Sequence, residues 1–279
     1  MKLLSFERDG RATWGAVVEG GVADLASTRF PTLRSVLAAD AIAEVRTQLA
    51  GRKADARLDA IRFLPVIPDP GKIVCVGLNY EEHRVETKRD KTENPALFLR
   101  VADSQVGHGQ PILRPRESTH LDYEGEIAIV IGRGGRRIAE ADAWKHIAGY
   151  SAYNDGSVRD WQRHTVQWTA GKNFHATGGF GPWMVTADEI ADGEVLTLET
   201  RLNGQVMQHA TTDMLIFSIP EQIRYISSFT TLEPGDVIVT GTPGGVGARR
   251  DPPVWMKPGD TVEIEVSKVG VLRNTIAQD

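Results

Sequence analysis

The sequence predicts a mostly β protein of the α+β class, with a small N-terminal α+β domain before a larger β-rich domain. Two observations support this prediction. After residue 71, short β-rich runs recur between turn residues, whereas helical patterns are confined to a few places. The spacing of these runs is too irregular for sequence repeats or for a doubly wound parallel sheet.

The N-terminal domain is expected at residues 1–65. Strands are predicted at 2–6 and 13–18, on either side of Asp9-Gly10, and a helical stretch at about 33–49. The segment from Pro65 to Gly71 contains three prolines and a glycine, which disfavour regular structure. We therefore place a linker at residues 66–71 and the large domain at residues 72–279.

The large domain is expected to consist mainly of strands. The predicted strands lie at residues 73–76, 96–99, 124–131, 196–202, 236–240 and 261–266, and the predicted helices at 140–146 and 219–228.

Composition and charge exclude several classes of protein. The net charge is −5 and the basic residues are scattered, which argues against a nucleic-acid partner. No apolar run approaches the roughly 18 residues that a membrane-spanning helix needs. The first ten residues lack the apolar core of a secretory signal, so we expect a cytoplasmic location. The single cysteine, Cys75, excludes an internal disulfide and a cysteine zinc cluster, and its apolar neighbours predict a buried strand residue.

The segment from Leu121 to Ile131 combines acidic residues with an apolar tail. Side chains alternate across a strand, so Glu124 and Glu126 are expected on the same face as Ala128 and Val130. Two buried carboxylates side by side require either a cation between them or a proton on one of them. An exposed strand end with two solvated glutamates is the alternative, and this motif alone does not separate the two.

A third acid, Asp155, ends a strand-like run that begins at Tyr150. Together with Glu124 and Glu126 it would form a site made only of oxygen ligands. Such a site favours Mg²⁺ or Mn²⁺ over zinc.

Nine segments of the sequence, taken together, resemble the fumarylacetoacetate hydrolase family. They occur in the family's order from Lys72 to the C-terminus. The segments are residues 76–83 (VGLNYEEH), 95–99 (PALFL), 122–126 (DYEGE), 153–155 (YND), 159–162 (RDWQ), 171–174 (GKNF), 180–183 (FGPW), 217–219 (FSI) and 240–247 (TGTPGGVG).

This resemblance implies a β-roll catalytic domain, a homodimer, and a divalent metal held by Glu124, Glu126 and Asp155. It also implies a catalytic pair, His83 and Glu86, on a segment at about residues 83–94 that becomes a lid helix when substrate binds. Residues three apart share one face of a helix, so Glu86 can orient the imidazole of His83.

The resemblance also implies further residues that contact the substrate. Lys172 is expected to bind the substrate carboxylate or a developing enolate, and Thr242 to bind a carboxylate. Arg159 and Gln162 are weaker candidates, and a structural ion pair is an open alternative for Arg159. No organic cofactor is implied.

Two departures from the family pattern stand out. Residues 71–80 contain no acid, whereas fumarylacetoacetate hydrolase itself has an additional aspartate ligand there, so the chain is more similar to the smaller bacterial acylpyruvate hydrolases, isomerases and decarboxylases. In addition, Arg100 stands where the family commonly has lysine, which leaves the role of that cation open.

The predicted function is hydrolysis of a C–C bond in a 2,4-dioxo acid, such as an acylpyruvate or fumarylpyruvate, in the catabolism of aromatic compounds or sugar acids. Water activated by His83 and Glu86 would attack the distal carbonyl. Two alternatives use the same site, namely a 2-hydroxyhepta-2,4-diene-1,7-dioate type isomerase and an oxaloacetate decarboxylase. A non-catalytic binding protein is disfavoured, because binding alone needs no general base.

Overall fold

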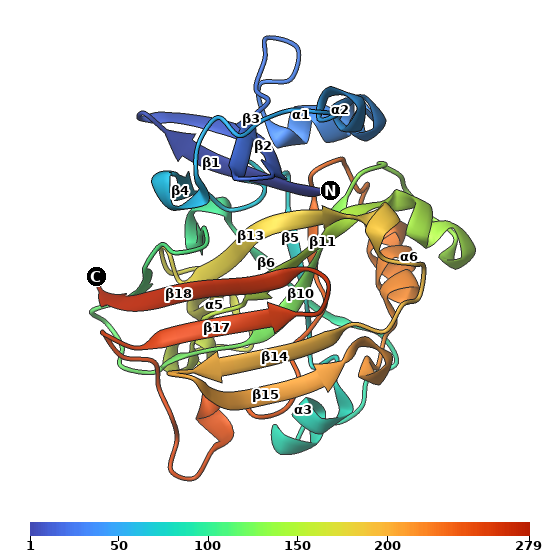
Figure 1. Ribbon diagram of the computed structural model, residues 1–279. Helices are drawn as coiled ribbons and strands as arrows, with labels where there is room; N and C mark the ends of the chain where they lie inside the picture. Colours follow the sequence, from blue (N-terminus) through green and yellow to red (C-terminus); the bar gives the residue numbers. More distant parts are fainter.

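The computed structural model describes residues 1–279, and its strands form two large sheets (Figure 1). The larger sheet has 11 strands in the order β3-β2-β1-β13-β11-β10-β16-β5-β6, with β4 paired to β1 and β7 paired to β13. The smaller sheet has five strands in the order β15-β14-β17-β18-β8, while β9 and β12 form a separate pair. The prediction of a mostly β, α+β fold is confirmed.

The strands are β1 (Lys2–Arg8), β2 (Arg11–Val18), β3 (Gly21–Asp24), β4 (Arg62–Phe63), β5 (Ile73–Gly77), β6 (Ala96–Arg100), β7 (Gln105–Val106), β8 (Ile112–Arg114), β9 (Leu121–Asp122), β10 (Gly125–Ile131), β11 (Ile147–Asn154), β12 (Ser157–Val158), β13 (Gly178–Thr186), β14 (Thr197–Leu202), β15 (Gln205–Thr211), β16 (Val237–Val239), β17 (Thr261–Val266) and β18 (Gly270–Gln278). The α-helices are α1 (Leu33–Ala38), α2 (Ile42–Gln48), α3 (Glu81–Glu86), α4 (Arg159–Gln162), α5 (Thr169–Lys172) and α6 (Ile219–Phe229). None of the helices is both long and apolar enough to cross a membrane.

The N-terminal hairpin forms as predicted, but the expected single helix is divided in two. Strands β1 and β2 pair on either side of Asp9-Gly10, both of which have positive φ, as a tight hairpin turn requires. Helix α1 begins at Thr32, which forms a capping box with Ser35. Asp40 has a φ of 52°, a left-handed conformation that no helix interior tolerates, so α1 and α2 are separate helices.

The N-terminal strands continue the large sheet of the rest of the chain. Strand β1 pairs with β13, with Leu3 opposite Met184. No helix or strand forms between residues 64 and 72, in agreement with the proline-rich composition of that segment. Because a sheet crosses the proposed boundary, the division at residues 66–71 stays a prediction.

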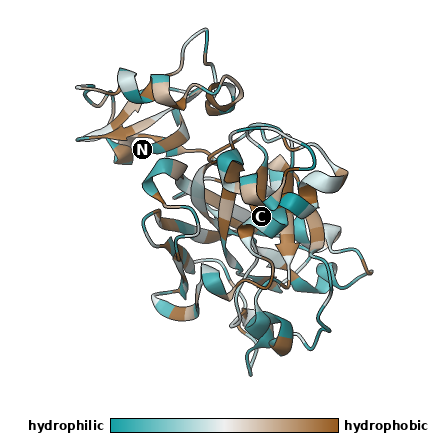
Figure 2. Ribbon diagram, turned by 90° about the vertical axis from the view of Figure 1, so that its right-hand side faces the viewer, coloured by the Kyte–Doolittle hydropathy of each residue, from teal (hydrophilic) through white to brown (hydrophobic).

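Strand β10 lies between two hydrophobic cores, and all its residues are buried. Ile127, Ile129 and Ile131 pack in a core with residues of β14, β17 and β18, while Ala128 and Val130 pack in a second core with residues of α1, α2 and β16. The small sheet and helices α1 and α2 therefore pack on opposite faces of β10, whereas α6 packs in the same core as the small sheet. Figure 2 shows hydrophobic residues in the strands.

All six strands predicted in the large domain are present, with small differences at their ends. Residues 140–146 form a 3₁₀ helix, and α6 begins with a capping box between Ser218 and Glu221. Strands β13, β15 and β18 were not predicted. Strand β13 contains three glycines and a proline, which are rare in strands, so its sequence does not predict a strand. Pairing with neighbouring strands in the sheet stabilises it instead.

Candidate active site

The three predicted acids lie together where β10 and β11 meet. Glu124 directly precedes β10, Glu126 lies in it, and Asp155 directly follows β11. The β10–β11 pairing places Gly125 opposite Asn154, and the Asp155 N–H donates to the Glu124 carbonyl at 2.8 Å. One carboxylate oxygen from each acid lies within 4.8 Å of the others. This spacing fits one small divalent cation.

Burial removes the alternative of a solvated strand end. Glu124 and Glu126 are 4% and 2% exposed, and Asp155 is fully buried. Carboxylates at such depth need partners, because an isolated buried charge is costly. The interpretation of two solvated glutamates is therefore wrong.

Three basic side chains compensate two of the acids. Lys172 Nζ lies 2.5 Å from Glu124 Oε2 and 2.5 Å from Asp155 Oδ2. Arg159 Nη2 lies 2.6 Å from Glu124 Oε1, and Arg100 Nη1 lies 2.5 Å from Asp155 Oδ1. Glu126 has no such basic partner, and it accepts a hydrogen bond from the Gly241 N–H at 2.6 Å. Glu126 is thus the acid whose charge remains least compensated.

The pKa values follow from this arrangement. Burial, together with the charges of Asp155 and Glu124, raises the pKa of Glu126 well above its usual value. Burial also acts to raise the pKa of Glu124, but Arg159 and Lys172 outweigh it and hold that pKa below its usual value. A bound divalent cation would favour the ionised form of all three acids. Their ligand atoms are all carboxylate oxygens, which Mg²⁺ and Mn²⁺ prefer.

His83 and Glu86 form the predicted pair on α3. Their Nδ1 and Oε1 atoms are 2.7 Å apart, and Glu86 Oε2 accepts a hydrogen bond from the Gly245 N–H at 3.0 Å. The glycine-rich segment thus fixes Glu86, and Glu86 fixes the imidazole. His83 is buried, and its Nε2 has no hydrogen-bond partner in the protein.

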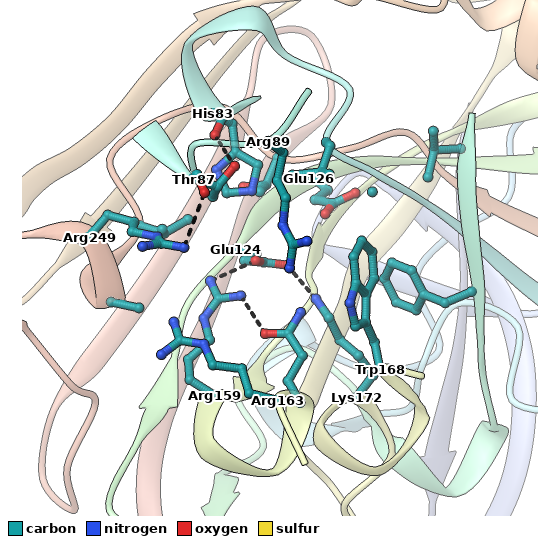
Figure 3. A pocket seen from close by; sticks show the side chains of 18 of the residues that line it. His83, Thr87, Arg89, Glu124, Glu126, Arg159, Arg163, Trp168, Lys172 and Arg249 are labelled. Carbon is teal, nitrogen blue, oxygen red and sulfur yellow. Dashed lines mark hydrogen bonds and ion pairs between the residues drawn. The ribbon is translucent and has the colours of Figure 1, made fainter. Parts of the chain in front are cut away.

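A cavity of about 370 Å³ brings these two groups together. His83 from α3, Glu124 and Glu126 from the β10 region, and Lys172 from α5 all line it. Figure 3 shows Glu124 between His83 on one side and Arg159 and Lys172 on the other. His83 therefore faces the buried glutamates and their basic partners across one small space.

The predicted residues Arg159, Gln162 and Thr242 also line this cavity, whereas Glu86 and Asp155 lie behind its lining. Thr242 and Gln162 already have hydrogen-bond partners in the protein. The Thr242 hydroxyl donates to the Gly125 carbonyl at 3.0 Å and accepts from Gln208 at 2.8 Å. Gln162 Oε1 accepts from Arg159 Nη1 at 3.0 Å, which leaves the Gln162 amide NH₂ free to donate. A substrate contact from Thr242 would require its hydroxyl proton to turn away from Gly125.

Asp122 is a site residue that the sequence reasoning did not single out. It is fully buried and accepts from Arg159 Nε at 2.8 Å, from the Gly247 N–H at 2.8 Å and from the Ala248 N–H at 3.0 Å. Arg159 therefore forms the ion pair that was left open as its alternative role. Asp122, Glu124 and Glu126 are each two residues apart. This alternation could have indicated that Asp122 also belongs to the site.

Arg100, whose role was left open, supports Asp155. Besides Asp155, its guanidinium donates to the Gly156 carbonyl at 3.1 Å and to the Thr177 hydroxyl at 3.0 Å. The planar fork of arginine satisfies these partners at once, which an ammonium group could not do with the same geometry. Arg100 thus holds the Asp155 carboxylate in position.

The predicted lid segment is only partly helical. Helix α3 covers Glu81–Glu86, whereas residues 87–94 are irregular and mostly exposed. Only the first turn of the expected lid segment is therefore helical in the structure. Helix formation over the rest of the segment on substrate binding stays a prediction.

Comparisons with known proteins agree with this fold. Residues 72–277 match the family model described as fumarylacetoacetate (FAA) hydrolase C-terminal. The chain is 39% identical over 265 residues to a mitochondrial oxaloacetate tautomerase of Bos taurus, covering 92% of this chain and 84% of the relative.

Two solved structures extend the comparison. A 2-hydroxyhepta-2,4-diene-1,7-dioate isomerase from Mycobacterium marinum is 31% identical with a TM-score of 0.77, covering 100% of this chain and 99% of that one. A maleylpyruvate hydrolase from Sphingobium sp. SYK-6, in complex with manganese(II) and pyruvate, is 27% identical with a TM-score of 0.82 and the same coverage. The chain therefore belongs to the fumarylacetoacetate hydrolase family.

Proposed function

We propose that this enzyme is a divalent-metal-dependent tautomerase that interconverts the enol and keto forms of a small 2-oxo diacid such as oxaloacetate. The observation that carries the proposal is the placement of His83, fixed by Glu86 at 2.7 Å, in one cavity with Glu124, Glu126 and Lys172. The 39% identity to an oxaloacetate tautomerase over most of both chains supports the same reaction.

Glu124, Glu126 and Asp155 would hold the metal ion. When bound, a divalent ion supplies Lewis-acid polarisation of the 2-oxo group and positive charge for an enolate. No other cluster of three or more acidic, histidine or cysteine side chains in the protein brings its ligand atoms so close together.

The protein's own groups account for the proton transfer. In ketonisation, the proton leaves the oxygen on C2 and a proton arrives at C3 of the substrate. His83 Nε2, which has no protein partner, is placed to move the proton at C3, while Glu86 keeps the ring oriented. Lys172 and Arg159 provide fixed positive charge beside the oxygen that carries the enolate charge.

Hydrolysis of an acylpyruvate, the reaction first predicted from the sequence, is the second candidate. The specific observation in its favour is the fold similarity to a maleylpyruvate hydrolase, with a TM-score of 0.82. The same His83–Glu86 pair would deprotonate a water molecule instead of a carbon. Hydrolysis thus requires room for a water in addition to substrate, whereas tautomerisation does not.

A substrate screen separates these candidates. The purified protein, loaded with Mg²⁺ or Mn²⁺, is mixed with enol-rich oxaloacetate, acylpyruvates, fumarylpyruvate and maleylpyruvate, while enol absorbance and pyruvate are followed together. A tautomerase removes the oxaloacetate enol signal faster than the background rate without releasing pyruvate. Stoichiometric pyruvate from an acylpyruvate would instead establish a hydrolase, and pyruvate with carbon dioxide from oxaloacetate would establish a decarboxylase.

A further inference from the structure

Three arginines that the catalytic argument does not use surround the mouth of the cavity. Arg89 follows α3, Arg163 follows α4, and Arg249 ends the 3₁₀ helix Gly247–Arg249. All three line the cavity, although they come from distant parts of the chain (Figure 3). This placement concentrates positive charge at one point of a chain whose net charge is −5.

These arginines differ from the basic residues deeper in the cavity. Lys172 and Arg159 are each paired with carboxylates, whereas Arg89, Arg163 and Arg249 have no carboxylate within ion-pair distance. Burial, followed by the charges of Arg249 and Arg159, lowers the pKa of the Arg163 guanidinium. Arg163 is therefore repelled by its basic neighbours, and the three arginines have no carboxylate partner in the protein.

We propose that Arg89, Arg163 and Arg249 form an anion subsite that binds the distal carboxylate of the substrate. The inference rests on the proposed function, because it assumes that the 2-oxo end of the substrate lies at the acid triad. A guanidinium matches a carboxylate in planar geometry, and two or three of them around one anion give charge-assisted hydrogen bonds. The enzyme then selects 2-oxo diacids over 2-oxo monoacids of the same length.

The position of Arg89 links this subsite to the lid. Arg89 lies three residues beyond α3, and Arg249 Nη2 lies 3.5 Å from the Thr87 carbonyl in the same segment. An anion held between Arg249 and Arg89 would draw residues 87–89 toward the cavity. The distal carboxylate thus helps to close the side of the cavity that carries His83.

A matched pair of stable ligands tests the subsite. 2-Oxoglutarate and 2-oxopentanoate share the 2-oxo acid end and the chain length, and they differ in a terminal carboxylate or methyl group. Their affinities for the Mg²⁺-loaded protein are measured by calorimetry. The proteins compared are the wild type, the double variant Arg163→Gln/Arg249→Gln and the control Arg116→Gln/Arg136→Gln. The control removes the same charge at two arginines that do not line the cavity.

We expect the wild type and the control to bind 2-oxoglutarate more tightly than 2-oxopentanoate. The Arg163→Gln/Arg249→Gln variant should lose about tenfold or more of this preference, the worth of one charge-assisted bond, with 2-oxopentanoate affinity unchanged. A preference that survives in this variant, or that the control loses equally, overturns the subsite.

The failure of the subsite is distinct from the failure of the proposed function. Enol–keto interconversion by the wild type, combined with no preference between the two ligands, refutes the subsite and leaves the tautomerase intact. A preference that depends on Arg163 and Arg249, in an enzyme that tautomerises no 2-oxo acid, supports the subsite and refutes the tautomerase.

Discussion

Replacement of Lys172 by Met tests the charge balance of the acid triad. Lys172 is 2% exposed, and its Nζ lies 2.5 Å from both Glu124 and Asp155. Met has a similar length and no charge, so the change leaves two buried carboxylates without their shared ammonium group. Removal of one partner from a buried ion pair costs roughly 3–5 kcal/mol. This is a large part of the roughly 5–15 kcal/mol that stabilises a typical protein.

A divalent cation should reverse most of this loss. Lys172 pairs with Glu124 and Asp155, which are two of the three acids that would hold the cation, so a bound ion would supply the charge that the variant lacks. We therefore expect Lys172→Met to be about 3–5 kcal/mol less stable than wild type in chelator. In excess Mg²⁺ the difference should fall to less than half of that value. The same variant should lose activity while metal is bound, because the enolate loses a cation.

Urea denaturation followed by circular dichroism measures both conditions. Lys268→Met is the matched control, since Lys268 pairs with Glu194 at the surface, and it should leave stability almost unchanged. Equal stability of Lys172→Met and wild type in chelator would refute the proposed charge balance. An equal loss with and without Mg²⁺ would show that the cation and Lys172 do not share their carboxylates.

Three further predictions concern the metal, the acid–base pair and the lid. Activity should vanish in excess chelator and return with Mg²⁺ or Mn²⁺, and Glu126→Gln should lower metal affinity in calorimetry without loss of the folded circular dichroism spectrum; full activity in chelator contradicts the metal site. His83→Ala should reduce the rate by about 10²–10⁴, and Glu86→Gln by less, with metal content checked in each variant; near-wild-type rates with metal bound would mean that another base acts. Amide hydrogen exchange across residues 83–94 should slow when oxalate or pyruvate binds, and equal protection in both states argues against a lid.

The acid triad could be predicted because its signal is local. Alternation along one strand placed Glu124 and Glu126 together, and a turn acid, Asp155, supplied the third ligand. The pairing of β10 with β11 then brings the three together as expected. His83 and Glu86 were identified through the family resemblance, and their spacing of three positions on one helix is consistent with the contact between them.

The supporting residues could not be predicted in the same way. Arg100 and Lys172 reach Asp155 from 55 and 17 residues away, and Asp122 reaches Gly247 across 125 residues. No periodicity encodes such contacts, because they depend on how the sheets pack. The homodimer, the cytoplasmic location and the division at residues 66–71 stay predictions.

The charges around the cavity connect the metal, the basic residues and the class of substrate. The inner site contains four buried acids, Asp122, Glu124, Glu126 and Asp155, and three basic partners, Arg100, Arg159 and Lys172. With all seven groups ionised, the net charge of this set is −1. A bound divalent cation would change the net charge to +1. Arg89, Arg163 and Arg249 add further positive charge at the mouth, with no acid to oppose it. A monoacid would neutralise only the inner excess, whereas a diacid also brings a carboxylate to the arginines. Because these three arginines line one cavity and have no carboxylate partner in the protein, the proposed subsite favours a dianionic substrate.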